Sequence, residues 1–173
     1  MSSLIYEGKK MKLTTDLCDE YEEDLITGSL QLLPLQFNMY GKKRQIAGEV
    51  TTIKALEDNS MVRKTLGTKG DGRVLLIDGG GSRRFALMGG DLGKLAEKNS
   101  WQGVIVFGCI RDVAELSVLD VGVWALGTCP RKSIKKNSGS INENIYIENV
   151  LISSGDYCAA DEDGVIISKK KLY

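Results

Sequence analysis

The sequence predicts an α/β fold in a single domain covering residues 1–173. A chain of this length fits one domain and buries roughly 70% of the surface that its extended form would expose. Short apolar runs bounded by turn residues indicate buried strands, and segments with helical spacing of apolar residues lie between several of them. Strands and helices do not alternate regularly, so the sequence favours a mixed arrangement that ends in a β-rich half.

The first forty residues are expected to form an arm, a helix and a connection. Residues 1–13 read as a short strand or a loose arm. A residue at 14–16 is expected to cap a helix that continues to Leu25. Consecutive side chains point in different directions on a helix, so the acidic run 19–24 favours a solvated helix face over a metal site. Residues 30–40 include a proline and are expected to be extended.

The next elements are a strand, a helix and a second strand. The alternating pattern of residues 46–56 predicts a strand. Residues 58–60 offer N-caps for a helix over 61–66, and the glycine-rich stretch 67–72 is expected to end that helix. The continuous apolar run 74–77 is short and bounded by turns, which is typical of a strand buried on both faces.

A glycine-rich turn, Asp78-Gly79-Gly80-Gly81-Ser82, follows the buried strand. Three glycines after a strand suggest a phosphate cradle, but neither the dinucleotide-binding pattern nor a P-loop is present. Residues 83–88 look like a returning strand. The sequence therefore favours a tight hairpin turn over a nucleotide loop.

The second half of the chain consists of short segments. We expect a helix over 92–98, a strand over 104–107, a helical turn over 113–119, a strand over 121–126, an exposed basic loop over 131–136, strands over 145–147, 150–152 and 165–167, and a basic tail over 169–173. The stretch 161–164 resembles part of a calcium loop, but it lacks the alternating ligands and the distal glutamate, so a hairpin turn is expected there.

The composition excludes several classes of function. The formal net charge is zero and aromatic residues are few, which argues against a nucleic-acid binder that relies on basicity or stacking. The chain contains no histidine, which excludes Ser-His-Asp and Cys-His catalysis and every histidine metal site. Its four cysteines include no C-x-x-C pair, and Cys109 reads as a small core residue. We expect a soluble cytoplasmic protein with reduced thiols and no membrane contact.

The stretch from Gly89 to Glu115 carries the candidate site. A glycine turn starts a helix there, and free backbone N–H groups at a helix start bind anions. Arg111 and Asp112 follow the buried strand directly, and Arg111 offers a planar fork that suits a carboxylate. If the helix packs antiparallel beside the strand, its start and the end of the strand lie at the same edge of the sheet. The alternatives are that Asp91 only caps its own helix and that Arg111 only forms a surface ion pair.

A metal ion is the second component of this hypothesis. Asp112 supplies a hard oxygen that suits Mg²⁺ or Mn²⁺, ions that keep several waters and often bind only one or two carboxylates. Glu115 lies three residues further on, on the same helical face, from which it would hydrogen-bond the waters of such a metal. A small anionic substrate and a metal would then meet at one edge of the sheet.

Several motifs resemble the RraA family, which comprises the regulators of ribonuclease E activity A and the related class II 4-hydroxy-4-methyl-2-oxoglutarate aldolases. The resemblance covers roughly residues 14–168. It is carried by these stretches: Leu17-Cys-Asp-Glu-Tyr, Glu57-Asp-Asn-Ser, Gly72-Arg-Val-Leu-Leu-Ile-Asp-Gly-Gly-Gly-Ser, Gly89-Gly-Asp-Leu, Gly108-Cys-Ile-Arg-Asp-Val and Gly155-Asp-Tyr-Cys-Ala-Ala-Asp-Glu-Asp-Gly. The family pattern of a glycine, twenty residues, Arg-Asp, two residues and an acid is matched by Gly90, Arg111, Asp112 and Glu115.

The resemblance implies a β/β/α sandwich like that of the swivelling phosphohistidine domains, assembled as a homotrimer with sites between subunits. It also implies a divalent metal on Asp112, and a pyruvate-like 2-oxo acid held by Arg111 and by Gly89, Gly90, Asp91 and Leu92. The reaction would be cleavage of 4-hydroxy-4-methyl-2-oxoglutarate to two pyruvates, or decarboxylation of oxaloacetate. Aldolases of the family carry an aspartate where this chain has Gly90, so the resemblance favours decarboxylation.

The rival hypothesis is a trimeric protein without catalytic activity that binds ribonuclease E, or an associated helicase, and inhibits RNA decay. The balanced charge indicates that such inhibition would act through protein surfaces and not through direct contact with nucleic acid. Asp112 favours the enzyme, because a docking protein needs no metal-binding carboxylate beside an arginine.

Overall fold

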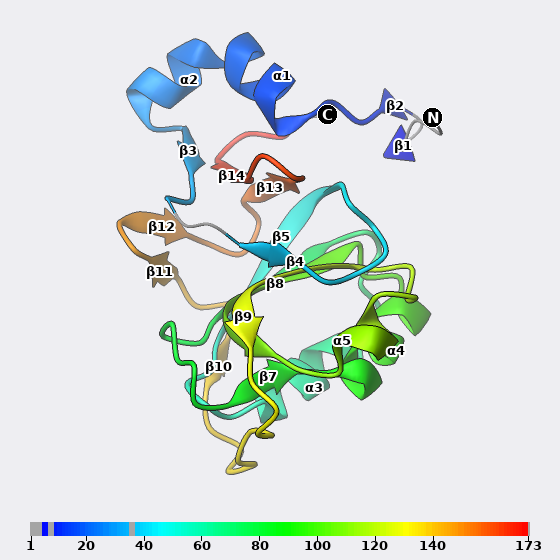
Figure 1. Cartoon of the computed structure of the whole chain (residues 1–173). Helices are drawn as coiled ribbons and strands as arrows, with labels where there is room; N and C mark the ends of the chain where they lie inside the picture. Colours follow the sequence, from blue (N-terminus) through cyan, green and yellow to red (C-terminus); the bar gives the residue numbers. More distant parts are fainter. Residues whose placement is uncertain (1–4, 7–8, 35–36, 173) are drawn as a thin grey trace.

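Parallel strands form the centre of the molecule (Figure 1). The structure is a computed structural model and describes residues 5–6, 9–34 and 37–172. They belong to a ten-stranded mixed sheet. In spatial order the parallel strands are β5 (Ile46–Lys54), β6 (Val74–Asp78), β8 (Gly103–Ile110) and β9 (Gly122–Thr128), and the short β7 (Ala86–Met88) pairs with the end of β8. Their carboxyl ends therefore share one edge, where sites in α/β layers usually form.

Antiparallel strands extend the sheet on both sides and make the β-rich half. Beyond β5 lie β13 (Tyr157–Ala160), β14 (Val165–Ser168) and β3 (Leu30–Leu32), while β4 (Asn38–Met39) pairs with β9 and β10 (Ser140–Ile141) pairs with β5. Two small ladders lie outside the sheet: β1 (Ile5–Tyr6) with β2 (Lys9–Lys10), and β11 (Ile145–Ile147) with β12 (Val150–Ile152).

Three helices cover one face of the parallel strands, and Figure 1 shows them gathered on the side away from β13 and β14. They are α3 (Ser60–Leu66), α4 (Gly90–Lys98) and α5 (Val113–Leu116). Side chains alternate between the faces of a strand, so Leu75 and Ile77 of β6 pack towards these helices and Val74 and Leu76 pack towards the β11–β12 hairpin. Burial on both faces explains the continuous apolar run.

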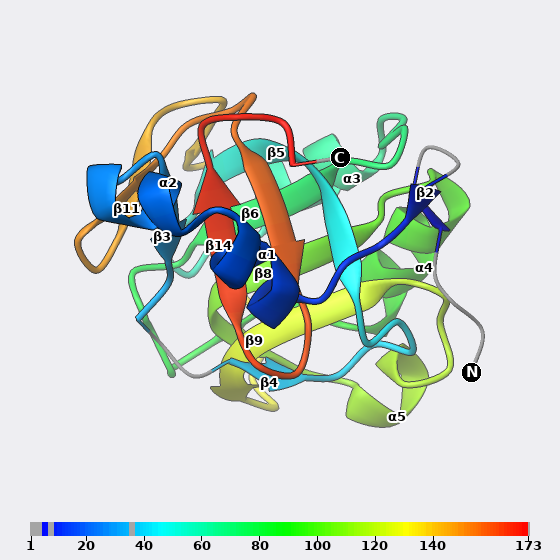
Figure 2. The same ribbon diagram turned by 90° about the horizontal axis from the view of Figure 1, so that it is seen from above.

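The N-terminal helical segment is broken in two. The structure contains α1 (Thr14–Glu20) and α2 (Glu22–Thr27), separated at Tyr21. Figure 2 shows α1 over β13 and β14, and α2 lies beside β3. The expected cap at 14–16 was wrong, because the helix starts at Thr14 and none of these side chains caps it. Thr14 instead donates from its N–H and its hydroxyl to the two carboxylate oxygens of Asp161, each at 2.7 Å. The acidic run mostly faces solvent, as expected for a surface helix.

The predicted hairpin after β6 was also wrong. The returning strand, β7, does not pair with β6 but crosses over to pair in parallel with β8. The glycine turn packs against β8 as well, since the N–H groups of Gly79 and Gly81 both donate to the carbonyl of Phe107 at 3.1 Å. This crossing places the end of β7, and the start of α4 after it, beside the end of β8.

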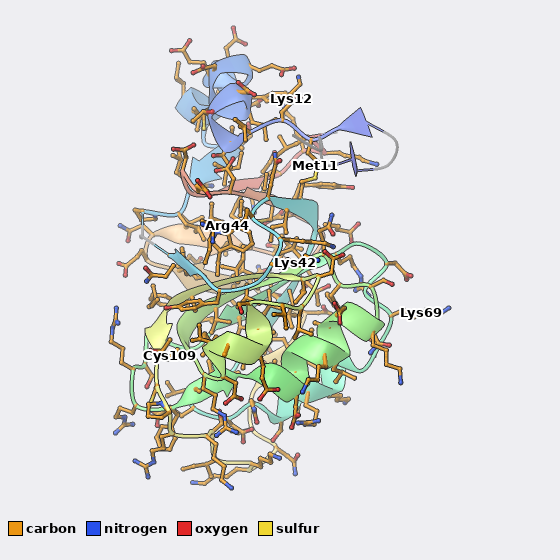
Figure 3. All side chains as sticks on the ribbon, turned by 45° about the vertical axis from the view of Figure 1, so that its right-hand side comes forward. Met11, Lys12, Lys42, Arg44, Lys69 and Cys109 are labelled. Carbon is orange, nitrogen blue, oxygen red and sulfur yellow. The ribbon has the colours of Figure 1, made fainter. Side chains whose placement is uncertain are left out.

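Most of the other expected elements are present. The strand at 46–56, the helix at 61–66 and the hairpin turn at 161–164 are confirmed, and Cys109 is buried on β8 (Figure 3). Sequence reasoning missed β13. The basic tail is anchored at its first residue, because Lys169 pairs with Asp156 at 2.6 Å. Parts of the predicted arm, at 1–4 and 7–8, and Tyr173 lie outside the described residues.

The structure has the mixed α/β class expected from the sequence, whereas the likeness to swivelling phosphohistidine domains stays a prediction. Within the described residues, no helix has the length and apolar character needed to cross a membrane.

Candidate active site

The ends of β7 and β8 are tied together at one edge of the sheet. The N–H of Arg111 donates to the carbonyl of Met88 at 2.9 Å, which joins the two chain segments just beyond the strands. The N–H of Gly90, the first residue of α4, donates to Asp112 Oδ2 at 3.1 Å. The start of α4 and the Arg111-Asp112 pair are therefore neighbours, as the antiparallel packing of helix and strand predicts.

Asp112 has an unusual backbone conformation. Its φ of 57° and ψ of 45° lie in the left-handed region, which residues other than glycine seldom adopt. Such conformations persist where the surrounding structure enforces them, and they occur often at functional sites. The side chain is one-third exposed, and its Oδ2 lies 3.3 Å from Nε of Arg111. The carboxylate is thus oriented by two donors and still reaches solvent.

Close packing explains the two glycines at the start of α4. A Cβ atom at Gly89 would lie 2.4 Å from Asp112 Oδ2 and 3.0 Å from Cγ of Arg111. A Cβ atom at Gly90 would lie 2.4 Å from Glu115 Oε2. Gly89 therefore leaves the space in which the Arg111-Asp112 pair sits, and Gly90 leaves the space for Glu115.

A pocket of about 100 Å³ opens at this edge of the sheet. Four cationic and two acidic side chains line it, so an anionic ligand is favoured on charge. The N–H groups of the first turn of α4, at Asp91 and Leu92, have no acceptor within the helix, which adds partial positive charge. The complete lining is Asn59, Arg63, Ala86, Met88, Gly89, Asp91, Leu92, Arg111, Asp112, Lys132, Ser133 and Lys135.

The structure brings five of the seven predicted site residues into this lining: Gly89, Asp91, Leu92, Arg111 and Asp112. Gly90 contributes its N–H to Asp112 but does not line the pocket. Glu115 does not line the pocket, and its carboxylate accepts a hydrogen bond from Lys94 Nζ at 2.7 Å. Its expected role at the waters of a metal stays a prediction.

Sequence reasoning missed the opposite wall of the pocket. Asn59 is the N-cap of α3 and Arg63 lies in its last turn, and Lys132, Ser133 and Lys135 come from the basic loop 131–136. The loop is largely exposed, as expected, but Ser133 is buried and donates from its hydroxyl to the carbonyl of Ala86. A serine within a run of basic residues was the only sequence signal that this loop is held against the protein.

Asp58 holds the far end of this loop. Its Oδ2 accepts from the N–H of Lys136 at 2.6 Å and from the N–H and hydroxyl of Ser138, and its Oδ1 accepts from the N–H of Ser60 at 2.7 Å. Burial alone would raise the pKa of Asp58, but the hydrogen bonds from Ser60, Lys136 and Ser138 outweigh it and hold the pKa well below its ordinary value. The buried carboxylate is therefore ionised and fixes the loop to α3.

The residues present fit a magnesium or manganese ion better than zinc. No group of three histidine, cysteine or acidic side chains converges within the described part of the chain, which disfavours a tetrahedral site. Asp112 and Asp91 both line the pocket, and Mg²⁺ commonly binds through one or two carboxylates while keeping several waters. Asp112 would be the principal ligand, since its orientation is fixed by Gly90 and Arg111.

Comparison with known proteins identifies the family. The model of the RraA-like proteins, described as Aldolase/RraA, matches residues 14–167. The chain belongs to the RraA-like family. A relative from Cupriavidus taiwanensis, provisionally named 4-hydroxy-4-methyl-2-oxoglutarate aldolase, is 48% identical over 160 residues, which are 92% of this chain and 97% of that protein. The family membership expected from the motifs is thus confirmed, and the chain is a member of a family that includes proteins named as aldolases.

Two solved structures of RraA-like fold superpose closely. One, from Geobacillus kaustophilus, is described as an S-adenosylmethionine:2-dimethylmenaquinone methyltransferase; it has a TM-score of 0.88 and 42% identity, covering 94% of this chain and 97% of that one. The other is the RNA-processing inhibitor RraA from Thermus thermophilis, with a TM-score of 0.86 and 39% identity over 92% and 94% of the chains. The relatives therefore share the fold but carry names for three different functions.

Proposed function

We propose that this protein is a divalent-metal-dependent lyase that acts on small 2-oxo acids. The substrate would be oxaloacetate, which is decarboxylated, or 4-hydroxy-4-methyl-2-oxoglutarate, which is cleaved to two pyruvates. One observation supports this best: Arg111, Asp112 and the first turn of α4 all face one small, cationic pocket. An aldolase name on a relative with 48% identity points in the same direction.

Arg111 would bind the carboxylate next to the 2-oxo group. A guanidinium forms two parallel hydrogen bonds with a carboxylate, which fixes both position and orientation. The ion pair with Asp112 holds Nε of Arg111 and leaves the terminal nitrogens of its fork for the substrate. The N–H groups of Asp91 and Leu92 at the start of α4 would donate hydrogen bonds to a negatively charged oxygen of the substrate.

The reaction needs charge stabilisation at the 2-oxo oxygen. In oxaloacetate the bond between C3 and the distal carboxylate breaks, its electron pair moves towards the 2-oxo group, carbon dioxide leaves, and C3 takes a proton from water. A divalent cation on Asp112 supplies Lewis-acid polarisation of the 2-oxo group when bound. The guanidinium and the helix amides stabilise the charge that develops on the same substrate. No lysine is needed for a Schiff base.

The pocket does not suit methyl transfer from S-adenosylmethionine. That cofactor carries a sulfonium cation, which four cationic side chains would repel. The methyltransferase description of the Geobacillus kaustophilus structure therefore does not carry over to this site.

The second candidate is a regulator of RNA decay, favoured by the 39% identity and close superposition with the RNA-processing inhibitor RraA. In this case the protein would bind ribonuclease E or an associated helicase through its surface. Under either function we expect a cytoplasmic homotrimer. The resemblance to the family's aldolases implies that a neighbouring subunit of this trimer supplies an additional acid.

Decarboxylation of oxaloacetate with Mg²⁺ or Mn²⁺, measured above the rate with metal alone, tests the enzyme. Asp112→Asn is the informative variant, because asparagine tolerates the left-handed backbone that alanine would strain. We expect at least a hundredfold loss of kcat/KM in this variant. Asp120→Asn removes an exposed carboxylate outside the pocket and serves as the matched control, with an unchanged rate.

Equal rates for the parent and Asp112→Asn would overturn the lyase. Binding to purified ribonuclease E, measured for the same two proteins, separates the second candidate. Tight binding that is unaffected by Asp112→Asn, in a protein without decarboxylase activity, would favour the regulator.

A further inference from the structure

Two of the four cysteines lie on one face of the sheet, at the edge that carries the pocket. Cys109 is on β8 (Figure 3) and pairs with Gly127 of β9. A Cβ atom at Gly127 would lie 4.0 Å from Cys109 Sγ, so both positions point to the same face. Cys129 follows two residues later, and its N–H continues the ladder by donating to the carbonyl of Ile110 at 2.9 Å. Because side chains alternate along a strand, Cys129 faces the same side as Cys109.

The two thiols differ in exposure but influence each other. Both are free; Cys109 is buried and Cys129 is partly exposed. The guanidinium of Arg83 lies over Gly127, with Nη1 3.0 Å from the place that a Cβ atom would take. Burial raises the pKa of the Cys109 thiol, the cation of Arg83 opposes part of that rise, and Cys129 adds to it. The two sulfurs are therefore neighbours, and a cation beside them favours the reactive thiolate form.

Cys129 is also the first residue of the connection from β9 to the basic loop. β9 ends at Thr128, and Lys132 forms a bridge with Ala86 on the side of β7 that faces away from β8. Residues 129–131 therefore cross the ends of β8 and β7. Four residue steps reach at most about 14 Å, and three strand spacings also span about 14 Å. The crossing has little slack, so a displacement of Cys129 passes to the loop that lines the pocket.

We propose that Cys109 and Cys129 are a modification site at which a hydroperoxide forms an intramolecular disulfide, and that this disulfide displaces the basic loop. Diagonal neighbours on adjacent strands have Cα atoms roughly 7–8 Å apart, whereas a disulfide joins Cα atoms about 4.4–6.8 Å apart. Cys129 must therefore approach by about 1–2 Å. It can do so because it lies beyond the end of β9 and gives up a single hydrogen bond, to Ile110.

The chemistry is a two-electron oxidation in two steps. The thiolate of Cys129, the more exposed sulfur, attacks one oxygen of hydrogen peroxide. The O–O bond breaks, the departing hydroxide takes the proton that Cys129 released and leaves as water, and Cys129 becomes a sulfenic acid. The thiolate of Cys109 then attacks this sulfur, and the S–O bond breaks. The second hydroxide takes the proton of Cys109, so two thiols and one peroxide give one disulfide and two waters.

Hydrogen peroxide at a slight molar excess over the whole chain tests the pair. The thiols titrated after denaturation should fall from four to two, and peptide mass spectrometry without reduction should find Cys109 joined to Cys129. Cys129→Ser should form no internal disulfide, and neither should Cys109→Ala, which keeps a small side chain in the core. Cys18→Ser is the matched control, because Cys18 is also partly exposed, and this variant should still form the disulfide.

Trypsin reports on the loop without any catalytic activity of this protein, since it cleaves after arginine and lysine and the loop 131–136 holds four such residues. The oxidised parent should be cut there at least tenfold faster than the reduced parent. Treatment with dithiothreitol, followed by its removal, should restore the slower cleavage. Oxaloacetate decarboxylation should fall at least tenfold on oxidation and recover in the same way, because the loop lines the pocket.

A parent that keeps all four thiols, or a disulfide that includes Cys18 or Cys158, overturns the site. A disulfide between Cys109 and Cys129 that leaves cleavage of the loop unchanged overturns the displacement. A reduced parent that does not decarboxylate oxaloacetate overturns the proposed function alone. In that case the linked peptide and the cleavage of the loop still decide the modification site, because neither depends on turnover.

Discussion

Gly89→Ala should inactivate the protein while leaving it folded. The backbone at Gly89, with φ of −154° and ψ of −167°, is extended and accessible to any residue, so alanine introduces no strain in the main chain. Its Cβ atom would instead lie 2.4 Å from Asp112 Oδ2, where ordinary contacts begin at 3.4 Å. The carboxylate therefore has to retreat by about 1 Å, and Cγ of Arg111, at 3.0 Å, has to move as well.

The two effects of this displacement differ in size. A shift of about 1 Å in a positioned group costs roughly a hundredfold in rate, so we expect kcat/KM for oxaloacetate to fall by about that factor. The stability cost is small, because the ion pair is partly exposed and the lost contact to Gly90 is a single hydrogen bond. Together they are worth about 1 kcal/mol of unfolding free energy.

Decarboxylation rates and urea unfolding of the same preparations provide the measurement. Gly164→Ala is the control, because a Cβ atom there meets nothing within 4 Å and its φ is not positive. A Gly89→Ala protein with activity within twofold of the parent would refute the reasoning. Equal losses of activity and of several kcal/mol of stability would show that Gly89 serves the fold and not the site.

Two further predictions concern buried groups. Asp58→Asn should lower the unfolding free energy by about 2 kcal/mol at pH 7, as measured by urea unfolding. Since the folded pKa of Asp58 is depressed, its contribution is fully present above its ordinary pKa. The stabilities of parent and variant should therefore begin to converge below about pH 4, and the contribution is lost only as pH falls through the depressed folded pKa. Iodoacetamide should alkylate the partly exposed Cys129 of the native protein well before Cys158, because burial shields this thiol and raises its pKa; faster labelling of Cys158 would contradict its burial.

The sequence predicts those parts of the fold that depend on local pattern. Two of the strands that run through the core, at 74–77 and 104–107, follow from apolar runs, and the helix after Gly89 follows from its glycine-rich start. The meeting of Arg111 with the start of that helix follows from the usual packing of a helix beside a strand. These are short-range rules, and the structure obeys them.

Errors arose where a distant segment decides the local structure. The turn at 78–82 has the composition of a hairpin, yet hydrogen bonds to Phe107 carry the chain past β6 to β8. Thr14 has the features of a helix cap, yet Asp161 binds both its donors. The basic loop reads as solvated because nothing near it in the sequence shows that Asp58 holds it. The three lining residues of this loop, Lys132, Ser133 and Lys135, were missed for this reason.

The outer edge of the sheet combines both ends of the chain. β3 pairs with β14, the N–H of Thr14 depends on Asp161, and Leu17 and Leu30 share one apolar cluster with Ile166 and Leu172. During synthesis these early residues have no partners until the last strands leave the ribosome. The nascent protein must therefore keep an unpaired strand and an uncovered apolar helix in solution, and a prematurely terminated product would remain in that state, exposed to proteases and to aggregation.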